Sequence, residues 1–115
     1  MRIPLPVALP VRRNCRIVVR SRRPTVRLRL ACSNEAIGHP REIFKPAFVF
    51  SAYGIVVVHN HPSGDPSPSE ADRRLTQRLR GAAELLSIRL LDHVILGNSE
   101  GGRVPWFSFR EAGLL

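Results

Sequence analysis

Apolar residues in this chain follow the spacing of strands over several segments. Alternating apolar positions from Thr25 to Leu30 predict a strand with one buried face. The uninterrupted apolar run from Ile55 to Val58 predicts a strand buried on both faces. Residues 89–96 and 104–109 predict two more strands, joined as a hairpin by a glycine-containing turn. The first 24 residues show no sustained period, apart from a short apolar run at 17–19 that suggests a strand.

Two other segments have apolar residues at helical spacing. Residues 41–52 predict a helix with one buried face, in which Pro46 is either tolerated near the start or kinks the helix. The apolar residues of that face are Ile43, Phe44, Ala47, Phe48 and Phe50. A longer helix is predicted from Pro68 to Leu86, with Ser67 as its N-cap and Glu70 closing a capping box. Strands interleaved with helices predict the α/β class.

Charge is distributed unevenly along the 115 residues. The first 30 residues contain nine arginines and no acid, whereas residues 31–115 contain equal numbers of basic and acidic residues. The formal net charge of +9 therefore belongs to the N-terminal quarter of the chain. We expect a divergent arm with one or two strands over residues 1–30 and one folded domain over residues 31–115. Such an arm can contact nucleic acid weakly through phosphates or form a solvated tail.

Cysteine content and hydropathy point to a cytoplasmic protein. Cys15 and Cys32 form no C-x-x-C motif, and we expect free thiols rather than a disulfide. No apolar run approaches the roughly 20 residues of a membrane span. At the N-terminus an apolar stretch precedes a basic one, the reverse of the order in a signal peptide. We therefore expect no membrane partner.

The residues that suggest chemistry lie in the stretch VHNHPSGDPSPSEAD, between the buried strand and the long helix. His59 and His61 are two residues apart in an extended segment, so their side chains point to one face. Asp72 shares the inward helix face with Leu75 and Leu79, which directs its carboxylate toward the strand. Two imidazoles and a carboxylate match a catalytic zinc with an open fourth position. An H-x-H pair alone is more often structural.

The spacing of His59-x-His61, Ser69 and Asp72 resembles the JAMM (MPN+) metalloprotease signature. The surrounding sequence is similar to the RadC-like (UPF0758) bacterial branch of that superfamily, over about two thirds of the chain. The similar segments are HPREIFKPA, HNHPSGDPSPSEAD, LLDHVILGN and FSFREAGLL.

The resemblance implies a mixed β-sheet flanked by helices, with an MPN-type, cytidine-deaminase-like core that is incomplete at the N-terminus. It implies that His59, His61 and Asp72 bind one zinc ion and that Ser69 hydrogen-bonds the reacting water or the oxyanion. The implied activity is hydrolysis of a peptide or isopeptide bond in a peptide or protein substrate. The family is also traditionally linked to DNA repair.

The general base that the resemblance implies is missing. In the family this base is a glutamate that precedes a Gly-Thr pair, at a position corresponding to Val26 or Arg27, and this chain has no acid before Glu35. Glu35 is more simply interpreted as a solvated loop residue, so the general base is unknown. Loss of a general base costs roughly 10²–10⁴-fold in rate, and we expect zinc binding with impaired hydrolysis. The alternative is a non-catalytic, metal-stabilised module whose basic arm contacts nucleic acid.

Several other residues receive simpler interpretations. We expect His93 to pack within the sheet rather than to act as a fourth ligand, and Asp92 can orient a ligating histidine. Asp65 is interpreted as a turn residue. The aromatic residues expected in the core of the hairpin are Trp106, Phe107 and Phe109.

Overall fold

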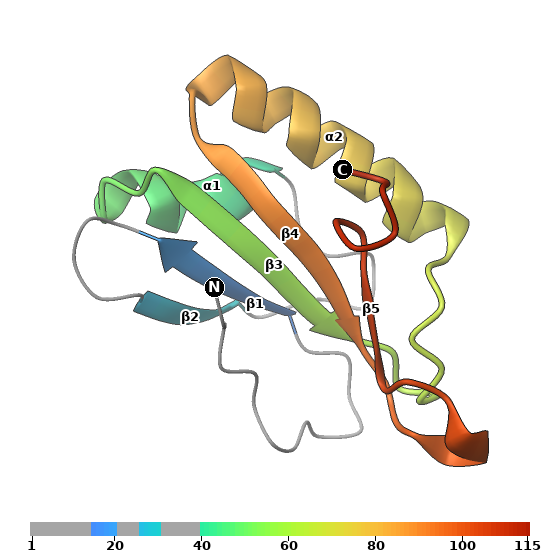
Figure 1. Cartoon of the computed structure of the whole chain (residues 1–115). Coiled ribbons are helices and arrows are strands. Elements are labelled where there is room, and N and C mark those ends of the chain that lie inside the picture. The colour runs from blue at the N-terminus through green and yellow to red at the C-terminus, as the bar shows by residue number, and fades with distance from the viewer. Residues whose placement is uncertain (1–14, 21–25, 31–39) are drawn as a thin grey trace.

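The computed structural model describes residues 15–20, 26–30 and 40–115 of the chain. Its strands form one mixed sheet in the order β2-β1-β3-β4-β5 (Figure 1). The strands are β1 (Cys15–Arg20), β2 (Val26–Leu30), β3 (Gly54–Asn60), β4 (Arg89–Leu96) and β5 (Trp106–Ser108). The central pair β3–β4 is parallel, whereas the pairs β1–β2, β1–β3 and β4–β5 are antiparallel. The predicted α/β fold with a mixed sheet is confirmed.

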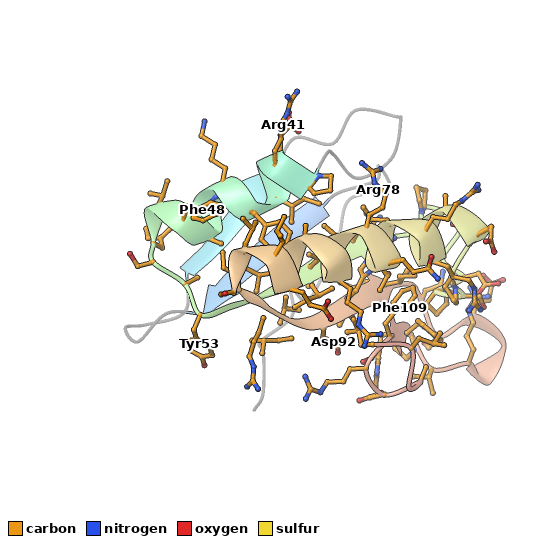
Figure 2. All side chains as sticks on the ribbon, turned by 90° about the horizontal axis from the view of Figure 1, so that it is seen from above. Arg41, Phe48, Tyr53, Arg78, Asp92 and Phe109 are labelled. Atoms are coloured by element: carbon orange, nitrogen blue, oxygen red, sulfur yellow. The ribbon has the colours of Figure 1, made fainter. Side chains whose placement is uncertain are left out.

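Helices α1 (Pro40–Val49) and α2 (Glu70–Leu86) pack on the same face of this sheet (Figure 2). A short 3₁₀ helix, η1 (Glu100–Gly102), lies in the turn between β4 and β5. The main core joins both helices to the sheet. Its buried residues are Ile43, Phe44, Ala47, Ile55, Val57, Leu75, Leu79, Ala83 and Ile88. The helical spacing of these positions along α1 and α2 explains why both helices dock through one stripe.

The alternation of side chains along β3 determines which face its residues occupy. Ile55 and Val57 belong to the helix-side core, whereas Val56 and Val58 belong to a second apolar cluster with Val94 of β4. Successive side chains of a strand point to opposite faces, so the side chain of the next odd residue, His59, lies on the helix side. The strand thus directs this imidazole toward the layer that contains α2.

Three aromatic residues predicted to be buried are largely exposed: the relative exposures are 56% for Phe48, 40% for Phe50 and 45% for Trp106. Phe48 follows the buried Ala47 by one residue, about 100° around a helix, which moves it off the buried stripe. Phe50 lies beyond the end of α1. Trp106 is the first residue of β5, the edge strand of the described sheet. Phe109 is buried, as predicted.

Several predictions concern residues outside the described ranges, among them the loop residue Glu35 and most of the basic arm. Within the described ranges, no helix is long and apolar enough to cross a membrane.

Candidate metal centre

Strand β3 brings two imidazoles to one end of the sheet. His59 is the penultimate residue of β3 and is fully buried, and His61 follows the strand directly and is partly exposed. The centroids of the two rings are 5.3 Å apart. The N–H of His61 donates to the carbonyl oxygen of Leu96 at 3.0 Å, which continues the pairing with β4 one residue beyond β3. The i and i+2 spacing therefore places both rings on one side, as predicted.

Helix α2 begins two residues later than predicted, and this shift concerns the site directly. The N-cap is Ser69, not Ser67. The Asp72 N–H donates to Ser69 Oγ at 3.1 Å, and the Ser69 N–H donates to Asp72 Oδ2 at 2.8 Å. Ser67 instead donates its N–H and its hydroxyl to Asp65 Oδ1. The capping box is thus closed by Asp72, so the carboxylate of the candidate ligand is fixed by the helix start that carries it.

The three candidate ligands converge at this point. Asp72 Oδ1 lies 3.2 Å from His59 Nε2, and Asp72 Oδ2 lies 2.9 Å from His61 Nε2. One ligand atom from each residue can be chosen so that all three lie within 4.8 Å of one another. Two imidazole nitrogens and a carboxylate oxygen are a donor set that divalent transition metals accept. The cluster can therefore hold a metal ion.

The loop carbonyl of Asp65 fixes which nitrogen of His61 faces the cluster. His61 Nδ1 lies 2.9 Å from this oxygen, and a carbonyl can only accept, so Nδ1 carries the proton. In the neutral ring Nε2 is then an acceptor that faces the carboxylate of Asp72. Acceptors that face one another are stabilised by a cation between them. The donor set and its orientation thus fit a metal.

A contact between the loop and the end of β4 supports this arrangement. The Asn98 N–H donates to the Gly64 carbonyl oxygen at 2.7 Å. A Cβ atom at Gly97 would lie 2.2 Å from that same oxygen, and one at Gly64 would lie 2.0 Å from the Asn98 side chain. Gly64 also has φ +85°, a conformation that favours glycine. Two glycines therefore let the loop that carries His61 approach β4 closely.

His93 of β4 lies behind His59, away from the other candidate ligands. It is fully buried, and its Nε2 is 3.0 Å from His59 Nδ1. Its ring stacks on Phe109 with centroids 4.7 Å apart and planes 7° from parallel. The expectation that His93 packs within the sheet agrees with these contacts. The sequence did not predict the contact between His93 and His59, because this contact depends on the parallel pairing of β3 with β4.

Asp92 does not orient a ligating histidine. It accepts hydrogen bonds from the Ser108 hydroxyl at 2.5 Å and from the backbone N–H groups of His93 and Arg110 at 2.7 and 3.1 Å. These bonds hold the segment after β5 against β4, and Figure 2 shows Asp92 and Phe109 on this side of the molecule. The suggestion that Asp92 orients a ligating histidine is therefore wrong. The residue that contacts His59 from β4 is His93.

The electrostatics of the cluster follow from burial and hydrogen bonding. Burial tends to raise the pKa of Asp72, but the adjacent His59 imidazole and the hydrogen bond from the backbone N–H of Ser69 outweigh it and hold the pKa below its usual value. Burial lowers the pKa of His93 to about 3. At neutral pH the site thus combines an ionised carboxylate with a neutral His93.

The predicted position of a general base lies at some distance along the sheet. Val26 and Arg27 of β2 lie in line, across β1, with Ile55 and Val56 of β3. These two β3 residues precede His59 by four and three positions. At a rise of ~3.3 Å per residue this is about 10 Å or more along the strands. Glu35 lies outside the described residues. Among the described residues, His59, His61 and Asp72 form a cluster of side chains that could hold a metal ion.

Comparisons with known proteins agree with the motif. Residues 25–114 match the model of the family described as RadC-like JAB domain. A UPF0758 protein of Chlorobium chlorochromatii is 54% identical over 82 residues, which are 71% of this chain and 35% of that protein. A UPF0758 protein of Thermotoga maritima is 48% identical over 88 residues, or 76% of this chain and 37% of that protein. The chain thus spans about a third of the length of these relatives.

Proposed function

The chain belongs to the RadC-like JAB domain family, and from this membership we propose that it is a metallopeptidase-type hydrolase domain with one zinc ion held by His59, His61 and Asp72. The observation that carries the proposal is the convergence of three ligand atoms within 4.8 Å from a strand end and a helix start. Three protein ligands with an open position are typical of catalytic rather than structural zinc. Iron and other divalent ions suit the same donors.

The role proposed for the metal is electrostatic. A zinc ion at this site would supply Lewis-acid chemistry, polarising a carbonyl oxygen and making water a stronger nucleophile near neutral pH. The protein residues hold the ligands in place: Asp65 and Ser69 fix the orientations of His61 and Asp72. The proposed substrate is a peptide or isopeptide bond in a protein that the family resemblance does not specify.

We assign Ser69 a second role beside its capping of α2. Its Oγ accepts the Asp72 N–H, and a hydroxyl that accepts still has its own proton to donate. Because Ser69 is hydrogen-bonded to Asp72, a candidate metal ligand, we propose that this proton is available to an oxygen that reacts beside the metal. Such a donor stabilises negative charge that develops on a carbonyl oxygen.

We further propose that hydrolysis is weak in this chain. No acid precedes Glu35, so the strand position from which the family takes its general base holds none. Absence of a general base costs roughly 10²–10⁴-fold in rate. The second candidate, a metal-stabilised binding module with a basic arm for nucleic acid, is favoured by this same absence and by the nine arginines of residues 1–30.

Metal analysis combined with a peptidase assay on the purified chain separates the two candidates. Bound zinc with turnover that Asp72→Asn abolishes supports the hydrolase. Bound zinc without turnover, together with salt-sensitive retention of nucleic acid, supports the binding module. A chain that binds no divalent metal contradicts both. Glu84→Gln, which removes an exposed carboxylate from the same helix, is the matched control.

A further inference from the structure

A buried line of polar contacts connects His59 to the first turns of α2. His93 Nε2 is 3.0 Å from His59 Nδ1, and His93 Nδ1 is 2.6 Å from Thr76 Oγ1. Thr76 Oγ1 is also 2.9 Å from the carbonyl oxygen of Asp72, one turn earlier in the helix. Thr76 is 2% exposed and His93 is fully buried. The line thus begins at one candidate ligand, His59, and ends at the backbone of another, Asp72.

The direction of every hydrogen bond in this line follows from one carbonyl. The Asp72 carbonyl can only accept, so the Thr76 hydroxyl donates to it. A hydroxyl has one proton, so Thr76 Oγ1 must accept from Nδ1–H of His93. A neutral imidazole carries one N–H, so His93 Nε2 accepts and His59 Nδ1 donates. This is the assignment in which both contacts of Thr76 are hydrogen bonds.

The tautomer of His59 follows from this assignment. With its proton on Nδ1, His59 presents Nε2 as the unprotonated nitrogen, 3.2 Å from Asp72 Oδ1. A metal can bind an imidazole only through an unprotonated nitrogen. In the opposite tautomer the proton would occupy the position from which His59 faces the cluster. The direction of the hydrogen bonds between Thr76, His93 and His59 therefore determines whether the unprotonated nitrogen of His59 faces the metal site.

We propose that Thr76 and His93 are positioning residues that hold His59 in its metal-binding tautomer before the metal arrives. The proposal rests on the metal site proposed above and extends it to residues outside the ligand set. Stacking on Phe109 fixes the plane of the His93 ring, so that its two nitrogens point toward His59 and Thr76. Burial keeps water from replacing either partner. The corresponding partner of His61 is the Asp65 carbonyl, which belongs to an exposed residue.

The first test is the tautomer of His59 in the metal-free wild-type protein, measured by ¹⁵N NMR of the imidazole nitrogens at neutral pH. The proposal predicts a proton on Nδ1 and none on Nε2. A proton on Nε2 of His59 in the metal-free protein overturns it. This measurement needs no variant and no bound metal, so it remains decisive even if the wild-type protein fails to bind zinc and the proposed function falls.

The second test compares zinc dissociation constants, measured by chelator competition, in two variants of Thr76. Thr76→Val keeps the shape of the side chain but cannot accept the proton of His93, so His93 and His59 are free to exchange tautomers. We expect zinc affinity to fall 10–100-fold, as for other groups that orient a metal ligand, with the His59 proton shifting to Nε2. Thr76→Ser restores the acceptor and should retain affinity and tautomer.

Ser108→Ala is the matched control for loss of a buried hydroxyl, because Ser108 bonds Asp92 outside this line. It should lower stability and leave zinc affinity and the His59 tautomer unchanged. If Thr76→Val does not fold, His93→Phe provides the second variant, since an aromatic ring can still stack on Phe109. Wild-type affinity in Thr76→Val or His93→Phe overturns the proposal while leaving the metal site itself intact.

Discussion

Ser69 and Asp72 hydrogen-bond each other in both directions, through the Ser69 N–H to Asp72 Oδ2 at 2.8 Å and the Asp72 N–H to Ser69 Oγ at 3.1 Å. Helix capping and ligand orientation are therefore the same interaction. A cap of this kind is worth roughly 0.5–2 kcal/mol. The capping geometry places that stabilisation at Ser69 and not at Ser67.

Ser69→Ala should therefore lower the free energy of unfolding by about 1 kcal/mol, measured by urea denaturation. Ser67→Ala, two residues away, should change it much less, because its hydroxyl bonds the exposed Asp65. Ser69→Ala should also weaken zinc binding, because it removes the Oγ acceptor of the Asp72 N–H and so loosens the helix start that carries Asp72. Equal effects of the two substitutions on stability and zinc affinity would show that the helix begins elsewhere.

The approach of the loop to β4 gives a second prediction. Gly97→Ala places a Cβ 2.2 Å from the Gly64 carbonyl oxygen, so the loop that carries His61 must move. We expect a loss of stability of about 1–3 kcal/mol, as for other overpacked sites, with reduced zinc affinity. Gly81→Ala is the control, because nothing lies within 4 Å of the added Cβ. That substitution in an exposed helix should be neutral or stabilising. Unchanged zinc affinity in Gly97→Ala would contradict the role given to this contact.

His93 predicts a pH dependence of unfolding in the metal-free protein. An unfolded histidine binds a proton below its ordinary pKa of 6.5, whereas burial lowers the pKa of His93 in the folded state to about 3. Between these values the unfolded chain binds more protons, so stability rises with pH and is lost as the pH falls from 6.5 toward 3.

The measurement is the free energy of unfolding as a function of pH for the wild type and for His93→Phe, both without metal. The slope in this window should be smaller by about one proton in the variant. Identical slopes would mean that His93 is protonated in the folded state, which the buried packing against Phe109 argues against.

The sequence was sufficient for the parts of the site that depend on local periodicity. The apolar runs predicted β3 and β4, the i and i+2 spacing placed His59 and His61 together, and the helical period turned Asp72 inward. The start of α2 could not be predicted, because Ser67-x-x-Glu70 and Ser69-x-x-Asp72 are both plausible capping boxes. The second is adopted, and its Asp72 also contacts the two histidines.

The support of His59 by His93 could not be predicted for a different reason. It depends on the parallel pairing that sets His93 beside Val57, two residues before His59. A parallel pair is separated by a long crossover, here through α2, and local sequence does not fix its register. A weaker signal was present: Thr76 lies four residues after Asp72, and His93 lies in a strand of apolar residues where an isolated polar group needs a partner.

The strand register also changes where a general base should be restored. Cys15 of β1 is the backbone partner of His59, whereas Arg27 is level with Val56. We therefore expect Cys15→Glu to raise peptidase activity by part of the roughly 10²–10⁴-fold that a general base contributes. Arg27→Glu should leave activity unchanged, with zinc content equal in both variants. Activity gained by Arg27→Glu and not by Cys15→Glu would contradict this register argument.

Calorimetric titration of the metal-free chain with zinc tests whether His59, His61 and Asp72 form a metal centre. We expect one zinc ion per wild-type chain, binding at least 10-fold weaker in Asp72→Asn and in His61→Ala, and unchanged binding in Glu84→Gln. A wild-type chain that binds no zinc, or that binds it equally well in Asp72→Asn, would contradict the proposal that these residues form a metal centre.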